Sequence, residues 1–158
     1  MDLPEENVAD YPRPPAIEPF TGRIRVWFAG LLVAETQISH RILETFHPPT
    51  YYLPRAAFFP GVLVDSGGRQ TICEWKGVAR YFDLVANGRT APRIAWSYPD
   101  PTAAFHAIAG AVAIYAEPLD RIEIDDIAVL PQPGNFYGGW VTPNVKGPIK
   151  GAPGTLHW

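Results

Sequence analysis

Eighteen prolines in a chain of 158 residues are the feature that most restricts how this sequence can fold. Proline lacks a backbone N–H, so it interrupts helices and is confined to the edges and ends of strands. The 14 glycines favour turns, and aromatic residues make up 13% of the chain. We therefore expect a mainly β protein with compact antiparallel coiled sheets, barrel- or tent-like, one short helix, and a core built from rings.

Size and charge limit the class of protein. The length suits a single domain with an ordinary core. The net charge of −3 leaves no basic excess, which argues against nucleic acid as a partner. The acidic, proline-rich start does not resemble a signal peptide, and no apolar run reaches the roughly 18 residues of a membrane helix. Cys73 is the only cysteine, so we expect no internal disulfide and a cytoplasmic location. Together with the absence of an apolar run, this predicts a soluble protein without a membrane partner.

Alternation of polar and apolar residues predicts a succession of strands. Residues 23–36 form a hairpin around a turn at Ala29 and Gly30. A second strong hairpin signal is Asn87 followed by Gly88. Further strands are predicted over residues 38–46, 50–53, 62–64, 69–75, 78–85 and 93–97, and one lies within 121–130.

One short helix is predicted after residue 100. Asp100 is the expected N-cap and Pro101 the expected first helical residue. The apolar face of this helix would contain Phe105, Ile108, Ala109 and Val112, although residues 112–115 fit a strand equally well.

These elements predict a central domain with two flanking segments. Residues 1–22 are a proline-rich N-terminal arm, expected to be a flexible tail, and residues 23–130 are a single β domain. Residues 131–158 are a tail rich in glycine and proline that carries Phe136, Tyr137, Trp140 and Trp158. Because solvated linkers rarely hold such rings, we expect the tail to pack on the domain or on a partner subunit, and a homodimer through residues 134–158 is one such arrangement.

A set of motifs, taken in order, resembles a known family. They read ET at 44–45 with HPPTYYLP at 47–54, CEWKG at 73–77, AWSYPDP at 95–101 and IAGAVAIY at 108–115. In this order and spacing they resemble the domain of unknown function 427 family over about residues 23–125. The ending FYGGW at 136–140 resembles that of longer members. The resemblance implies a compact antiparallel fold of strongly coiled sheets, and a nucleotidyltransferase-like label has been attached to the family.

The motif residues predict an aromatic pocket with one acid and one base. Rings with a few polar groups are typical of small-molecule sites. The expected ligand-binding residues are Tyr51, Tyr52, Trp75, Lys76, Trp96 and Tyr98, and the candidate catalytic residues are Lys76 and Glu44. The preferred function is small-molecule binding or ligand processing around Trp75, Lys76 and Tyr98.

A purely structural interpretation competes with this pocket. The rings can be core residues, and Lys76 and Glu44 can form an ion pair that shapes the fold. On a regular strand Trp75 and Lys76 would also point to opposite faces, unless Gly77 introduces a bulge.

Other chemistries have weaker signals. A desolvated Lys76 could act as a base or nucleophile, and Cys73 could use His47 or His106 as a base, although an inert buried cysteine is the better interpretation. The histidines at 40, 47, 106 and 157 follow no ligand spacing, so neither a metal nor a cofactor is expected.

Two further functions stay as alternatives. A nucleotidyltransferase-like enzyme would need paired carboxylates, for which Glu123 and Asp125 are candidates, and a phosphate cradle, for which residues 65–68 offer a glycine turn. A structural or interaction module would associate through its C-terminal tail.

Overall fold

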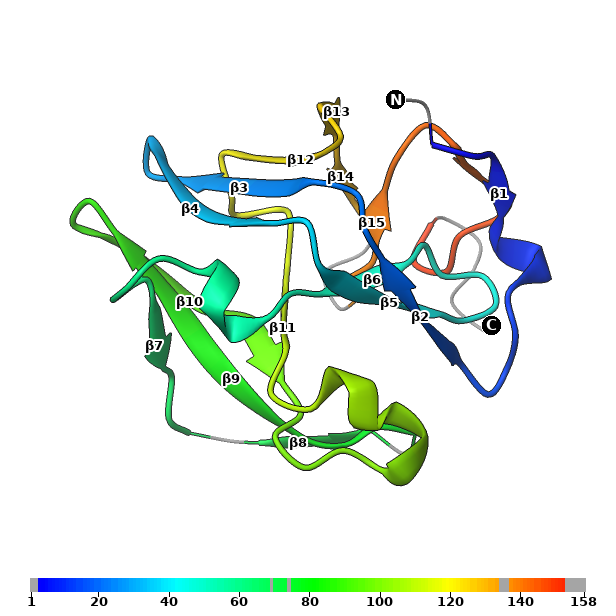
Figure 1. The fold of residues 1–158 in the computed structure, drawn as a ribbon, viewed down its shortest axis with the longest axis horizontal. Helices are drawn as coiled ribbons and strands as arrows, with labels where there is room; N and C mark the ends of the chain where they lie inside the picture. Colours follow the sequence, from blue (N-terminus) through cyan, green and yellow to red (C-terminus); the bar gives the residue numbers. More distant parts are fainter. Residues whose placement is uncertain (1–2, 69, 74, 134–136, 153–158) are drawn as a thin grey trace.

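The computed structural model describes residues 3–68, 70–73, 75–133 and 137–152. The protein is mainly β, and its sheets are antiparallel except for one short parallel pair, as Figure 1 shows. Within the described residues the sheet paths stay open and do not close into a barrel. The predicted fold class is confirmed.

The first sheet is built on the predicted N-terminal hairpin. β3 (Ile24–Phe28) pairs with β4 (Leu31–Thr36), and β12 (Arg121–Ile124) and β13 (Ile127–Ala128) continue the sheet beyond β3. The turn residues Ala29 and Gly30 have φ of +53° and +79°. Such angles are those of the tight turns whose twist matches the paired strands, so the hairpin prediction is confirmed.

The second sheet contains the longest hairpin. β9 (Gly77–Ala86) and β10 (Arg89–Ser97) are joined at Asn87 and Gly88, which have φ of +51° and +75°. β11 (Val112–Ile114) lies beside β10, while β7 (Leu63–Asp65) and β8 (Thr71–Cys73) pair with β9. β10 begins earlier than the predicted strand at residue 93 because a register shift between Ala91 and Ala95 accommodates Pro92.

The third sheet incorporates the N-terminal arm. β2 (Ala16–Phe20) pairs with β5 (Ser39–Leu43), which pairs with β6 (Thr50–Tyr52). Upstream lie β1 (Glu6–Asn7) and the short helix η1 (Val8–Asp10). The buried guanidinium of Arg41 bonds to both carboxylate oxygens of Glu6, at 2.9 Å each, and to Glu18 at 2.6 Å. The expectation of a loose arm is therefore wrong for this segment, because its charges and backbone are paired with β5.

The described part of the C-terminal tail also pairs within the chain. β14 (Leu130–Pro131) pairs with β15 (Trp140–Val141), and β16 (Val145–Lys146) runs parallel to β1. Trp140 is 1% exposed, lies in the main core, and donates from Nε1 to the Ile114 carbonyl at 2.9 Å. Phe136 and Trp158, which we expected to pack, lie outside the described residues.

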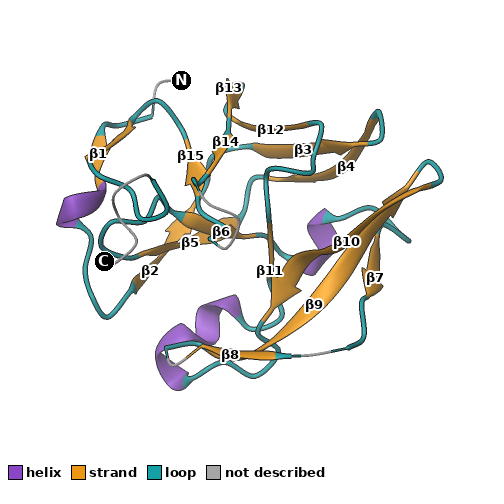
Figure 2. Ribbon diagram, turned by 180° about the vertical axis from the view of Figure 1, so that it is seen from behind, coloured by secondary structure: helices purple, strands orange, loops and turns teal. Residues whose placement is uncertain are grey.

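The helix after residue 100 differs from its prediction. It is a 3-10 helix, η3 (Ala103–Ile108), with Thr102 rather than Asp100 at its N-cap, and Val112 belongs to β11. The hydroxyl of Thr102 donates to the Trp75 carbonyl at 2.5 Å, and its N–H donates to the Lys76 carbonyl at 3.1 Å. These bonds hold the start of the helix against the β8–β9 turn, and Figures 1 and 2 show η3 and β8 at the same end of the molecule. A second 3-10 helix, η2 (Arg55–Ala57), follows β6.

The core is divided into two main clusters because neighbouring residues of a strand face opposite sides. On β11, Val112 and Ile114 belong to the main cluster, whereas Ala113 belongs to a second cluster. On β6, Tyr51 belongs to the main cluster and Tyr52 to the second one. The second cluster forms the floor of the candidate site.

Candidate functional site

A cavity of about 420 Å³ opens where β5, β6, the β8–β10 sheet and the C-terminal tail meet. This volume lies within the range of about 300–1,000 Å³ that small-molecule sites occupy. The predicted residues that line it are Glu44, Tyr52, Trp75, Lys76, Trp96 and Tyr98. The structure therefore brings together every predicted site residue except Tyr51.

Trp75 and Lys76 both line the cavity, which a regular strand would not allow. They lie in the turn between β8, which ends at Cys73, and β9, which begins at Gly77. Gly77 has φ of +110°, and a Cβ there would lie 3.4 Å from the carbonyl oxygen of Asp100. The glycine thus permits a turn that side chains with a Cβ disfavour, and strict alternation does not apply.

Tyr51 does not share this cavity with the other predicted site residues; it lines a separate hollow with Phe20 and Arg41. Its ring stacks on Trp140 with centroids 5.1 Å apart and makes an edge contact with Phe20, also at 5.1 Å. Because Tyr51 precedes Tyr52 on β6, the two side chains must leave opposite faces of the strand. Only Tyr52 points toward the site.

Hydrogen bonds and ring contacts hold the floor of the cavity in place. Trp96 donates from Nε1 to the hydroxyl of Tyr52 at 3.2 Å, and its ring lies 4.7 Å from that of Tyr115. The ring of Tyr98 lies 6.4 Å from that of Tyr52. Edge and tilted ring pairs of this kind stabilise a fixed arrangement. The floor is therefore a preformed aromatic surface.

Three tyrosine hydroxyls of the site, those of Tyr52, Tyr98 and Tyr115, stay neutral. Burial raises the pKa of Tyr52, Tyr98 and Tyr115 above the ordinary value of 10.0. For Tyr98, the neighbouring Cys73 and Tyr81 raise the pKa further. A neutral hydroxyl keeps its proton and so remains a hydrogen-bond donor at physiological pH.

Sequence reasoning missed several residues of the wall. Tyr81 from β9, Tyr115 after β11 and Tyr137 from the tail add phenol rings, and the hydroxyl of Tyr81 shares a 2.8 Å hydrogen bond with Thr71. Alternation along β9 places Tyr81 on the same strand face as Ala79, but nothing in the sequence shows that this face borders the cavity. Tyr137 had no such signal, because its position depends on the path of the tail.

His47 and Gln132 form the polar side of the wall. Gln132 is buried, and its amide donates to Nδ1 of His47 at 3.1 Å and to the Lys150 carbonyl at 2.8 Å. The amide oxygen accepts from the N–H of Gly139 at 3.1 Å. Burial lowers the pKa of His47 below its ordinary value of 6.5, so the ring is neutral at pH 7. Sequence reasoning considered His47 as a base for Cys73 and among the histidines tested for metal-ligand spacing, and it did not include Gln132.

The charges of the cavity do not form the ion pair that a structural role of Lys76 and Glu44 would require. Glu44 instead pairs with Arg13, with an N–O distance of 3.8 Å. The ammonium of Lys76 lies 5.9 Å from the ring of Tyr98 and 6.0 Å from that of Phe105. The ammonium of Lys150 lies 5.5 Å from the ring of Tyr137. Among the described residues, neither lysine has a carboxylate within 4.0 Å.

Cys73 and His47 both line the cavity, whereas His106 does not. Cys73 is a free, half-buried thiol in the cavity wall. Within the described ranges, no group of three or more His, Cys, Asp or Glu side chains is arranged to hold a metal ion. His157 and Glu74 lie outside those ranges.

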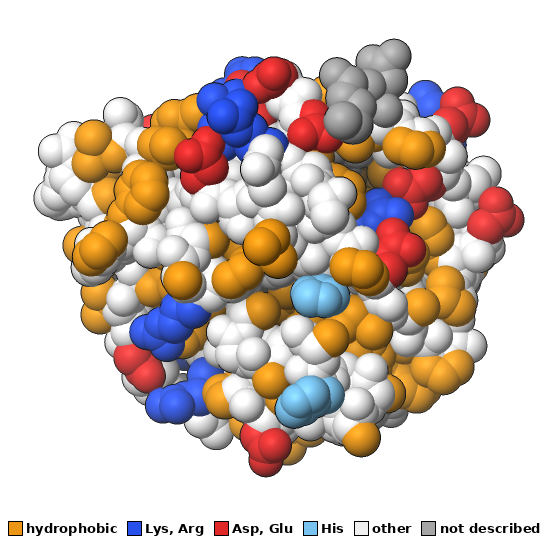
Figure 3. All heavy atoms as spheres, in the orientation of Figure 1, with side chains coloured by type: hydrophobic (Ala, Val, Ile, Leu, Met, Phe, Trp, Pro, Cys, Tyr) orange, Lys and Arg blue, Asp and Glu red, His pale blue; other side chains and the backbone are white. Residues whose placement is uncertain are grey.

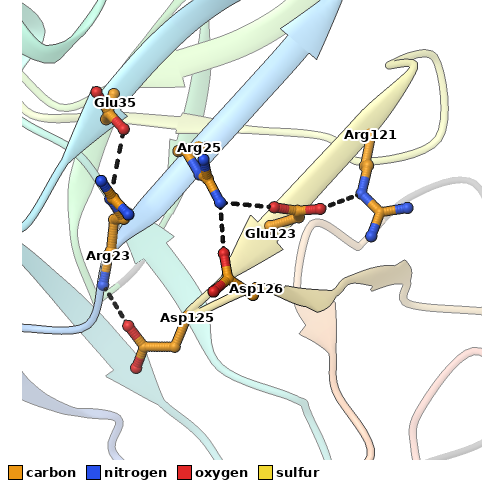
Figure 4. Close-up of polar contacts among 7 residues, drawn as sticks. All are labelled: Arg23, Arg25, Glu35, Arg121, Glu123, Asp125 and Asp126. Atoms are coloured by element: carbon orange, nitrogen blue, oxygen red, sulfur yellow. Dashed lines mark hydrogen bonds and ion pairs between the residues drawn. The ribbon is translucent and has the colours of Figure 1, made fainter. Parts of the chain in front are cut away.

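The carboxylates considered for nucleotidyl transfer are engaged with arginines, as Figure 4 shows. Glu123 pairs with Arg25 at 3.1 Å and also with Arg121. β12 ends at Ile124, so Asp125 does not share a strand face with Glu123, and its carboxylate accepts from the N–H of Arg23 at 2.9 Å. These contacts stabilise the edge of the first sheet and do not present paired free carboxylates.

The surface gives two general observations. On the face that Figure 3 shows, basic side chains lie next to acidic ones rather than in a separate basic region. Within the described residues, no helix has the length and apolar character needed to cross a bilayer.

Comparison with known proteins identifies a family but no activity. The family model described as a domain of unknown function (DUF427) matches residues 16–125. No curated protein matches the chain. The matched range contains the aromatic floor of the cavity, whereas Gln132, Tyr137 and Lys150 lie beyond it.

Proposed function

We propose, for a chain that belongs to the domain of unknown function 427 family, that the cavity binds a small molecule. The observation that carries this proposal is the convergence of rings and charged groups from separate sheets on one hollow of about 420 Å³. A void of this size inside a packed core would be unusual, and this one opens to the surface, where a ligand can enter.

The chemistry of the wall supports this proposal. The rings of Trp96 and Tyr98 give a flat apolar surface, and neutral tyrosine hydroxyls give directional hydrogen bonds. Lys76 and Lys150 add positive charge near the rings. A planar molecule with a few polar groups matches this combination. A cytoplasmic location, expected from the single cysteine, is part of the same proposal.

Native mass spectrometry of the protein purified from its own host tests the proposal. The expected spectrum contains the chain with a bound small molecule that is lost on denaturation. Thr71→Phe is expected to abolish binding, since Thr71 lines the cavity beside Tyr81, with which its hydroxyl shares a hydrogen bond. Val78→Phe is the matched control, because Val78 is exposed and does not line the cavity. Equal occupancy in both variants would refute the assignment to this cavity.

The alternative functions have less support. Nucleotidyl transfer would need carboxylates other than Glu123 and Asp125. Incubation with labelled ATP and Mg²⁺ tests this function. The protein should transfer the label, and Lys76→Met should abolish the transfer. Association through residues 134–158 stays a prediction. The burial of Trp140 in its own chain supports a role of the tail in the fold.

A further inference from the structure

We propose that the ligand carries an anionic group, a carboxylate or a phosphate, that is bound by Lys76 and Lys150 together with Nε2 of His47. This inference rests on the proposed ligand-binding function and names the chemical class of the ligand. It also assigns a role to the C-terminal tail, which supplies one of the two lysines.

The charge of the cavity wall is the first argument. Among the residues that the structure describes, the wall contains two lysines and one carboxylate, Glu44, and that carboxylate is already paired with Arg13. Within the described residues the lysine ammonium groups face rings and have no anionic partner. A cation in a partly desolvated hollow attracts an anion more strongly than the same cation on an open surface. This positive charge, which no described carboxylate neutralises, therefore favours an anionic ligand.

The hydrogen bonds of His47 are the second argument. Backbone groups fix the amide of Gln132, because its oxygen accepts from the N–H of Gly139 and its nitrogen donates to the Lys150 carbonyl. The nitrogen must therefore donate to Nδ1 of His47, and the proton of the neutral ring is on Nε2. No hydrogen bond to Nε2 is present among the described residues. His47 thus offers a positioned N–H donor in the wall.

The placement of Lys150 is the third argument. Its N–H donates to the Phe46 carbonyl at 2.7 Å, and its own carbonyl accepts from Gln132 at 2.8 Å. The first bond attaches the tail to the turn that contains His47, and the second attaches Lys150 to the side chain of Gln132, which itself bonds to His47. Lys150, Lys76 and His47 line the same cavity, and both lysine charges lower the pKa of His47. The tail therefore completes a site whose other cation comes from the β8–β9 turn.

Paired probes of equal shape test this inference by calorimetric titration. Phenylacetate and phenylacetamide differ in charge, and phenyl phosphate replaces the carboxylate with a phosphate. We expect phenylacetate to bind the wild-type protein at least about 10-fold more tightly than phenylacetamide, in line with a charge-assisted hydrogen bond. This preference should fall with added salt.

Lysine variants identify the groups responsible. Lys76→Met and Lys150→Met should each weaken phenylacetate binding by about 10-fold and leave phenylacetamide binding unchanged. Lys146→Met is the matched control, because Lys146 is exposed on β16 and does not line the cavity. Thermal melting verifies that each variant is folded. Tighter binding of phenyl phosphate than of phenylacetate would identify a phosphate ligand, and the reverse order a carboxylate ligand.

Equal affinity for phenylacetate and phenylacetamide would overturn the anionic inference while leaving a binding cavity, provided that Thr71→Phe blocks both probes. Absence of binding by all three probes would also overturn it. The proposed function would then depend on native mass spectrometry alone, so the two failures are distinguishable.

Discussion

The amide of Gln132 donates to Nδ1 of His47 over 3.1 Å, although the two residues are 85 positions apart in the chain. This bond connects the turn after β5 to the C-terminal tail. The same amide also bonds to Gly139 and Lys150, so one buried side chain organises the polar wall of the cavity.

Gln132→Met should destabilise the protein by about 1–3 kcal/mol, because the change leaves the buried hydrogen-bond partners of the amide unsatisfied. Urea unfolding measures the loss. Gln37→Met is the control, since Gln37 is exposed and a surface change of this kind costs less than about 0.5 kcal/mol. Equal stability of the two variants would show that Gln132 does not organise the wall.

Acidification should destabilise the protein through His47. Burial lowers the pKa of His47 in the folded protein below the value of 6.5 that it has in the unfolded chain. Between these two pKa values the unfolded chain binds more protons than the folded protein. The free energy of unfolding therefore falls as the pH is lowered through this interval. The nearby Lys150, Arg13 and Lys76 lower this pKa further, while Glu44 opposes them.

Urea unfolding between pH 7.5 and 5 tests the effect of His47. The wild-type protein should lose more stability over this interval than His47→Gln, which does not titrate there. Parallel pH profiles for the two proteins would contradict the assignment.

Trp140→Ala should destabilise the protein by about 3–5 kcal/mol, as large buried rings do when truncated. The change removes the stacking on Tyr51 and the hydrogen bond to the Ile114 carbonyl. Chemical denaturation measures it, with Leu130→Ala as an exposed control. A loss below about 1 kcal/mol would mean that the tail is not part of the core.

Arg41→Met should release the N-terminal arm. Removal of one partner of a buried pair costs about 3–5 kcal/mol, and we expect the lower end because Glu18 is solvent-accessible. Hydrogen exchange at β1 and β2 should accelerate. Arg121→Met, at a half-exposed pair, should cost less than about 1 kcal/mol. Unchanged hydrogen exchange in the arm would show that Arg41 does not hold the arm in place.

Lys76→Met should reduce stability by less than about 1 kcal/mol, because its described side-chain contacts are cation–π contacts at 5.9 and 6.0 Å. Thermal melting measures this. Unfolding of the variant would instead make Lys76 a structural residue and weaken the proposed site.

Much of the local structure could be predicted from the sequence. The hairpin of residues 23–36 and the turn at Asn87 and Gly88 follow from alternation and from turn residues, which act between neighbours in the chain. The motifs also identified Tyr52, Trp75, Lys76, Trp96 and Tyr98 as candidates. Alternation applied to β6 would have separated Tyr51 from Tyr52, but nothing in the sequence shows which face of the strand borders the cavity.

The sequence by itself therefore determined the strands, their turns and an inventory of rings and charges, since these depend on short-range sterics and periodicity. The tertiary structure decided which rings share a hollow, that the tail brings Gln132 and Lys150 to His47, and that Thr102 bonds to the β8–β9 turn instead of Asp100 capping the helix. Such contacts join distant segments through the path of the chain. Their physical cause is complementary packing and hydrogen bonding across sheets, which no local pattern encodes.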